Sequence, residues 1–116
     1  MNISRKEVLE NLIEFRRPLK EIGDMLAEHP WDSEVKLVIL TPDHVINVLD
    51  RFIGGELTTS EIDQWANMIK FRDDIGFRGA LSNQTKQAIW ELANPDLTHP
   101  FSKERADKIR GALLFV

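Results

Sequence analysis

The stretch GELTTSEIDQWANMIKFRDDIGF, residues 55–77, combines a turn, a helix start and a charged end. Thr58 and Glu61 have the spacing of a capping box, in which each side chain satisfies a free backbone N–H of the first turn. Apolar residues then recur on one helical face: Ile62, Trp65, Ala66 and Ile69. The stretch therefore predicts a helix that begins near Thr58, with Trp65 packed in the core.

The segment before this stretch has the features of a second buried helix. Thr41 is a favourable cap, Pro42 suits the first helical position, and the carboxylate of Asp43 suits the positive end of a helix. Apolar residues follow on one face: Val45, Val48, Leu49 and Phe52. Gly54 and Gly55 predict the end of this helix.

The N-terminal segment predicts one long helix with a kink. Ser4 and Glu7 have capping-box spacing and mark its start. Apolar residues recur at alternating steps of four and three: Val8, Leu12, Phe15, Leu19, Ile22 and Leu26. Pro18 interrupts the pattern and removes one intrahelical hydrogen bond. Because the apolar phase continues across Pro18, we expect a kinked helix rather than two helices.

Residues 35–40, VKLVIL, form the only β-like run in the chain. This run is either an extended connector under the helices or an edge strand that pairs with another copy of the chain. Residues 75–80 contain two glycines and are expected to form a loop.

Two further helices complete the predicted fold. One begins at Ser82 and the other near Ser102, and each has an apolar face: Ala88, Ile89, Leu92 and Ala93 in the first; Ala106, Ile109, Leu113 and Val116 in the second. The sequence therefore predicts an all-α protein with a single domain, residues 1–116, built as one compact bundle of about five helices.

The composition is that of an ordinary globular protein. The chain has 116 residues, of which 42% are hydrophobic and 29% charged, and it contains no cysteine. No apolar run approaches the roughly 20 residues that span a bilayer, and the N-terminus lacks the apolar core of a secretion signal. We therefore expect a cytoplasmic protein with no membrane association.

The net charge of −4 is unevenly distributed. Between Glu21 and Asp63, ten acidic residues stand against Lys36 and Arg51, which gives −8 and leaves +4 for the remainder. Because phosphate binding requires clustered lysine and arginine, we expect no nucleic-acid partner. The acidic segment is either a solvated face or a surface that attracts a basic protein.

Motifs for metal binding and catalysis are missing from the sequence. His29, His44 and His99 lack the spacing that brings two imidazoles together, so we expect no metal site. There is no cysteine nucleophile, no G-x-S-x-G motif and no glycine-rich phosphate loop, so we assign no catalytic residue and no cofactor.

Asp73 and Asp74 have two readings. They are either turn residues that pair with Arg72 or Arg78, or members of a catalytic cleft. The side chains in such a cleft are those of Arg51, Arg72, Asp73, Asp74 and Glu91.

Trp90 lies off the apolar face of its helix. It is either covered by a neighbouring helix or exposed as an anchor for a partner. Trp31, in an acidic loop, is a second candidate anchor. The candidate partner-binding residues are Trp31, Asp32, Glu34, Arg72, Asp73, Asp74 and Trp90.

Two blocks of the chain resemble a group of small bacterial helical proteins of unknown activity. These are LTPDHVINVLDRFIGGELTTSEIDQWANMIKFRDDIG, residues 40–76, and IWELANPDL, residues 89–97. The phrase RFIGGELTTSEIDQW is also similar to helical immunity proteins of the colicin D type, in which an acidic bundle caps a basic nuclease. That similarity transfers no binding residues.

The leading hypothesis is a non-enzymatic protein-binding module, and the second resemblance implies an immunity-type inhibitor of a basic toxin or nuclease. One alternative is a homo-oligomer, such as a homodimer, in which residues 35–40 or the N-terminal apolar stripe pack against a second copy. The other is an enzyme built on the cleft around Arg72.

Overall fold

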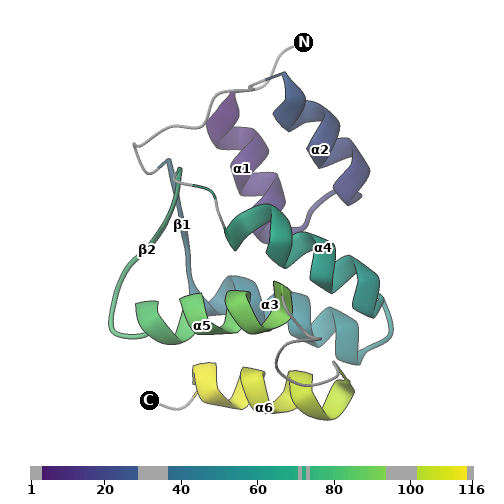
Figure 1. Cartoon of the computed structure of the whole chain (residues 1–116), viewed down its shortest axis with the longest axis vertical. Coiled ribbons are helices and arrows are strands. Elements are labelled where there is room, and N and C mark those ends of the chain that lie inside the picture. Colours follow the sequence, from purple (N-terminus) through teal and green to yellow (C-terminus); the bar gives the residue numbers. More distant parts are fainter. Residues whose placement is uncertain (1–3, 29–36, 71, 73, 94–101, 115–116) are drawn as a thin grey trace.

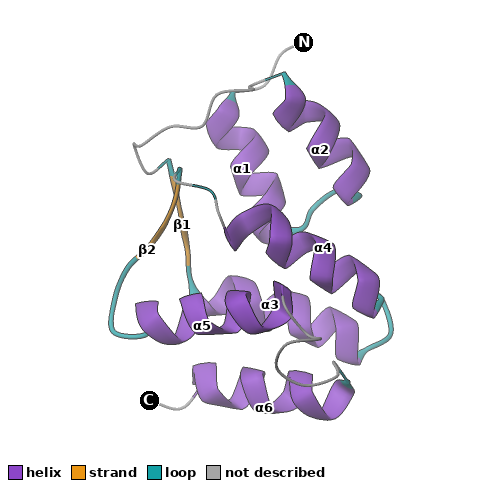
Figure 2. Cartoon of the chain, in the orientation of Figure 1, coloured by secondary structure: helices purple, strands orange, loops and turns teal. Residues whose placement is uncertain are grey.

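Six α-helices and two short strands form within the residues that the computed structural model describes, which are 4–28, 37–70, 72, 74–93 and 102–114. In chain order they are α1 (Arg5–Glu14), α2 (Leu19–Ala27), β1 (Val38–Leu40), α3 (Pro42–Ile53), α4 (Thr59–Lys70), β2 (Ile75–Phe77), α5 (Ser82–Ala93) and α6 (Lys103–Leu114). Figure 2 shows that helices make up most of the fold and that the two strands are short. The predicted helical bundle is confirmed, with one helix more than expected and a two-stranded sheet.

The kinked helix predicted at the N-terminus is wrong, because α1 and α2 are separate helices. After α1, Phe15 adopts a left-handed conformation with φ 49°. Its N–H donates to Leu12 O at 3.1 Å, and the Arg16 N–H donates to Asn11 O at 3.0 Å. This pair of bonds is the Schellman motif, which normally has glycine at the left-handed position. Pro18 then precedes α2, which starts in a new direction.

Long-range contacts hold Phe15 in this conformation. Its ring is buried, and the Arg51 guanidinium lies 5.0 Å from the ring centroid. Arg51 Nη1 also donates to Phe15 O at 2.8 Å. Trp65 Nε1 donates to Leu12 O at 2.6 Å. The end of α1 is therefore fixed by side chains of α3 and α4, which local sequence patterns do not reveal.

The helix starts predicted from capping patterns are confirmed. The Thr58 N–H donates to Glu61 Oε1 at 3.0 Å, and the Glu61 N–H donates to Thr58 Oγ1 at 3.1 Å. Thr41 precedes α3, and its N–H donates to Nδ1 of His44 at 2.9 Å. The predicted apolar faces of α3 and α4 are buried, and Trp65 is fully inaccessible to solvent.

The β-like run pairs within the chain. β1 lies parallel to β2 in the register Val38↔Ile75, Ile39↔Gly76 and Leu40↔Phe77. Residues 35 and 36 of the run lie outside the described residues. The loop predicted at residues 75–80 is therefore wrong for its first three residues. A three-residue strand containing glycine carries almost no periodic signal, and its partner lies far away in the sequence.

The helices are arranged along the longest axis of the molecule, about 40 Å in extent. Figure 1 shows α1 and α2 at one end and α5 and α6 at the other. α5 packs chiefly on α4, and α6 packs on α3. The apolar stripe of α1 is buried within the chain, and one edge of β1 pairs with β2, while the homo-oligomer stays a prediction. None of the described helices has the length and apolar character needed to cross a membrane.

The bond from Trp65 to α1 predicts a large difference between two tryptophan substitutions. Trp65→Phe removes the Nε1 donor and leaves unfilled space, so we expect a loss of about 2–3 kcal/mol in the free energy of unfolding. Trp90→Phe changes an exposed ring and should cost less than about 0.5 kcal/mol. Denaturant unfolding followed by circular dichroism measures both. Equal losses would contradict the structural role of Trp65.

The His44 cap predicts a pH dependence of stability. Burial lowers the pKa of His44 below its ordinary value of 6.5, although the charges of Glu14 and Asp43 oppose this shift. The unfolded chain therefore binds the proton more readily, and the free energy of unfolding should fall as pH drops below 6.5. The protonated ring also loses its ability to accept the Thr41 N–H bond.

The control for this dependence is His44→Gln, which cannot titrate in this range. The difference in unfolding free energy between wild type and variant, measured from pH 7.5 to 5, isolates the contribution of His44. If both chains lost stability equally, the lowered pKa would be the wrong explanation.

Candidate functional site

Arg72 and Asp74 form a buried structural ion pair. The Asp74 side chain is 0% exposed, and it accepts from Arg72 Nε and Nη2, both at 2.9 Å. Arg5 Nε lies 4.0 Å from Oδ2 of the same carboxylate group. The Asp74 carbonyl oxygen accepts the Leu37 N–H at 2.9 Å. Asp74 therefore joins α1, β1 and the end of α4, and its carboxylate is not available to a partner.

The four described side chains of the alternative catalytic cleft, those of Arg51, Arg72, Asp74 and Glu91, are not gathered in one place, and Asp73 lies outside the described residues. Arg51 is bound to Glu56 and to the carbonyl oxygen of Phe15, while Arg72 is bound to Asp74. Glu91 instead accepts from Arg105 Nη2 at 2.7 Å. These are separate ion pairs in different parts of the fold. Within the described ranges, no three histidine, aspartate or glutamate side chains form a set that could hold a metal ion.

Of the remaining candidate partner-binding residues, the structure describes only Trp90. Trp31, Asp32, Glu34 and Asp73 lie outside the described residues. Trp90 is described, and 48% of its surface is exposed, so a neighbouring helix does not cover it; its role as an anchor for a partner stays a prediction.

Trp90 belongs to a surface that combines aromatic rings with lysines. Lys70 Nζ lies 5.1 Å from the centroid of the Trp90 ring. Lys86, one turn before Trp90 on α5, has its Nζ 5.5 Å from the centroid of the Phe77 ring. We call these four residues, Lys70, Phe77, Lys86 and Trp90, the Trp90 patch. Its charge is positive, in contrast to the acidic net charge of the chain.

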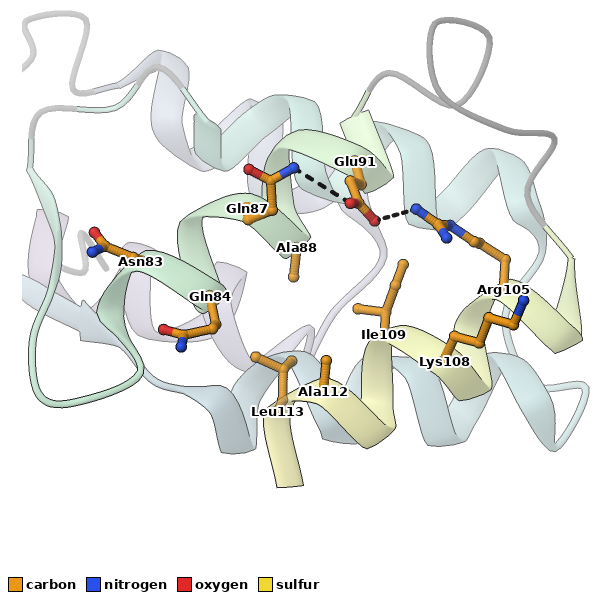
Figure 3. Close-up of a pocket in the computed structure, with 10 residues that line it drawn as sticks. All are labelled: Asn83, Gln84, Gln87, Ala88, Glu91, Arg105, Lys108, Ile109, Ala112 and Leu113. Atoms are coloured by element: carbon orange, nitrogen blue, oxygen red, sulfur yellow. Dashed lines mark hydrogen bonds and ion pairs between the residues drawn. The ribbon is translucent and has the colours of Figure 1, made fainter. Parts of the chain in front are cut away.

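A groove of about 360 Å³ lies between α5 and α6. Figure 3 shows four apolar side chains that point into it: Ala88 from α5 and Ile109, Ala112 and Leu113 from α6. Three amide side chains, Asn83, Gln84 and Gln87, line the α5 side. Glu91, held between Gln87 and Arg105, closes one end. Sequence analysis missed this groove, because it depends on how two helices pack.

A second surface of interest lies on α2. Glu21, Asp24 and Glu28 are all exposed, and we call these three residues the acidic face. No ion pair joins them to another side chain among the residues the structure describes, whereas Asp50 and Glu56 are paired with Arg110 and Arg51. A shallow groove of about 450 Å³ between α2 and α4 adjoins this face, lined in part by Gly23 and Asp63.

Comparison of the chain with protein-family models, with curated proteins and with solved structures finds no significant match. The resemblances to bacterial helical proteins and to immunity proteins of the colicin D type therefore stay predictions.

The buried position of Asp74 predicts a large cost for neutralising it. Asp74→Asn leaves two arginines around a neutral group, so we expect a loss of about 3 kcal/mol in the free energy of unfolding. Asp50→Asn breaks the exposed pair with Arg110 and should cost about 0.5 kcal/mol. Urea unfolding of both variants at pH 7 compares them. Similar costs would show that Asp74 does not hold the fold together.

Proposed function

We propose that this protein is a non-enzymatic cytoplasmic module that binds a basic protein through the acidic face of α2. The observation that carries this proposal is that three exposed carboxylates are neighbours on α2 and form no ion pair with any side chain among the described residues.

The three carboxylates of the acidic face repel one another. At about 100° per residue they lie within a narrow arc, on the side of α2 opposite the buried Ile22. Asp24 is three residues from Glu21 and four from Glu28, the spacings at which helical side chains are neighbours. Each such pair of like charges costs an isolated helix roughly 0.2–0.5 kcal/mol.

Other features of α2 also weaken it. Glu28 occupies the C-terminal cap, where the helix dipole disfavours a negative charge. Pro18 at the start provides no side-chain cap. Gly23, in the middle of the helix, costs about 1 kcal/mol relative to alanine, although a Cβ there would meet no atom within 4 Å. Residues that destabilise their own helix without a gain elsewhere in the structure are expected at functional sites.

A basic partner would remove this unfavourable repulsion. Lysines or arginines of a second protein, brought against the acidic face, would neutralise the carboxylates that no side chain of the described residues pairs with. The acidic field would also speed the encounter at low ionic strength. The groove between α2 and α4 offers a concave surface beside the face. The resemblance to colicin D type immunity proteins supports a narrower form, in which the partner is a basic toxin or nuclease that this protein inhibits.

The test is the variant Glu21→Gln/Asp24→Asn/Glu28→Gln. The variant removes the repulsion and the unfavourable dipole contact of Glu28, but it also removes the favourable charge of Glu21 in the first turn, so we expect its free energy of unfolding to change by less than about 0.5 kcal/mol. We expect the same variant to lose a basic protein that the tagged wild type captures in stoichiometric amounts from the source cell, as identified by mass spectrometry.

The matched control is Glu7→Gln/Glu104→Gln/Asp107→Asn, which makes the same change of net charge at exposed positions elsewhere. It should retain the partner. The proposal fails if the α2 variant still captures the basic protein, if the wild type captures none, or if the control loses the partner equally.

A further inference from the structure

The Trp90 patch and the groove between α5 and α6 form one continuous surface. On α5, Gln87 projects between Trp90 on one side and Ala88 on the other, at about 100° per residue. The patch therefore lies on the α4 side of α5, and the groove lies on the α6 side. This surface is at the opposite end of the molecule from α2 (Figure 1).

The apolar content of this surface requires a partner with apolar side chains. The groove has an apolar floor, and its volume of about 360 Å³ is large enough for several side chains. Trp90 is 48% exposed. Exposed tryptophans are enriched among the residues that contribute most to protein interfaces.

The charges around this surface favour an acidic partner. Lys70 and Lys86 belong to the patch, and Lys108 lines the groove. Glu91 is neutralised by Arg105, and the contact of Lys108 with Glu104 is long, at 4.0 Å between highly exposed side chains. The local balance is therefore positive, and carboxylates complement it.

Single-stranded nucleic acid fits this surface less well than protein does. Bases bind by stacking on exposed aromatic faces, but Lys70 lies over the Trp90 ring and Lys86 lies over the Phe77 ring. The net charge of −4 also repels a polyanion at long range. The amide groups of Asn83, Gln84 and Gln87 are donors and acceptors that suit the polar groups of a peptide.

We propose that the Trp90 patch and the groove together bind an acidic amphipathic segment of a partner protein. Its apolar side chains fill the groove between Ala88, Ile109 and Leu113, and its carboxylates face the lysines of the patch and the groove. This surface is separate from the acidic face and has the opposite charge. The protein therefore has two surfaces that can bind two different proteins, or two segments of one partner protein.

The test is a nuclear magnetic resonance titration of the ¹⁵N- and methyl-labelled full chain with designed probes of equal length. One peptide alternates glutamate with leucine at helical spacing, a second has lysine in place of glutamate, and a third has serine in place of leucine. A short single strand of thymidine nucleotides is the fourth probe. We expect the Glu/Leu peptide to bind at least roughly tenfold more tightly than the others and to shift the Trp90 indole and the methyl groups of Ile109 and Leu113.

Two variants identify which side chains of the surface contribute to peptide binding. Lys86→Glu/Lys108→Glu should weaken binding of the Glu/Leu peptide by roughly tenfold or more, and Ala112→Arg should block the groove. Lys6→Glu/Lys20→Glu makes the same charge change at exposed positions of α1 and α2 and should have little effect. Circular dichroism confirms that each variant is folded.

Several results would overturn the proposal. These are equal binding of the Lys/Leu peptide, shifts that map away from α5 and α6, and the absence of any shift at millimolar peptide. Tighter binding of the thymidine strand would make the surface a nucleic-acid site instead.

Discussion

The carbonyl groups at the end of α1 constrain much of the structure. A helix leaves its last carbonyls without intrahelical donors, and burial makes an unmet carbonyl costly. Here Leu12 O accepts from Trp65, 53 residues along the chain, and Phe15 O accepts from Arg51, 36 residues along the chain. These bonds stop α1 against α3 and α4 and hold Phe15 in a strained conformation. The chain then turns before α2. Within α2, Ile22 is the one fully buried residue.

The same contacts explain where sequence reasoning succeeded and where it failed. The starts of α3 and α4 were predictable, because a cap depends on residues three or four apart. The burial of Trp65 followed from helical periodicity in the same way. The break at Phe15 was not predictable, because non-glycine residues adopt left-handed conformations only when distant groups compensate for the strain. The same holds for β2 and for the groove, whose existence depends on partners far away in the sequence.

The residues on which the predicted resemblance to small helical proteins rests are chiefly those that hold this fold together. Arg51 and Trp65 secure the end of α1, and Arg72 binds the buried Asp74. Asn67 Nδ2 donates to Ala93 O at 3.2 Å and so joins α4 to α5. The acidic face lies outside the resembling stretch, and so does most of the groove. A resemblance of this kind predicts a shared scaffold more directly than a shared partner, since the two candidate surfaces can change without disturbing these bonds.

The two candidate surfaces, which carry opposite charges, lie far apart in the folded chain. The acidic face and the Trp90 patch lie toward opposite ends of the long axis, so neither neutralises the other within one molecule (Figure 1). Two copies could in principle meet head to tail through these surfaces, and contacts of that type extend into open chains unless they close. The acidic face is poorly suited to this, because the side of α2 that carries its carboxylates has only Ala27 as an exposed apolar residue. Filling the groove between α5 and α6 requires large apolar side chains, which this side of α2 does not supply. The apolar groove therefore favours a foreign segment with larger side chains over the α2 helix of another copy.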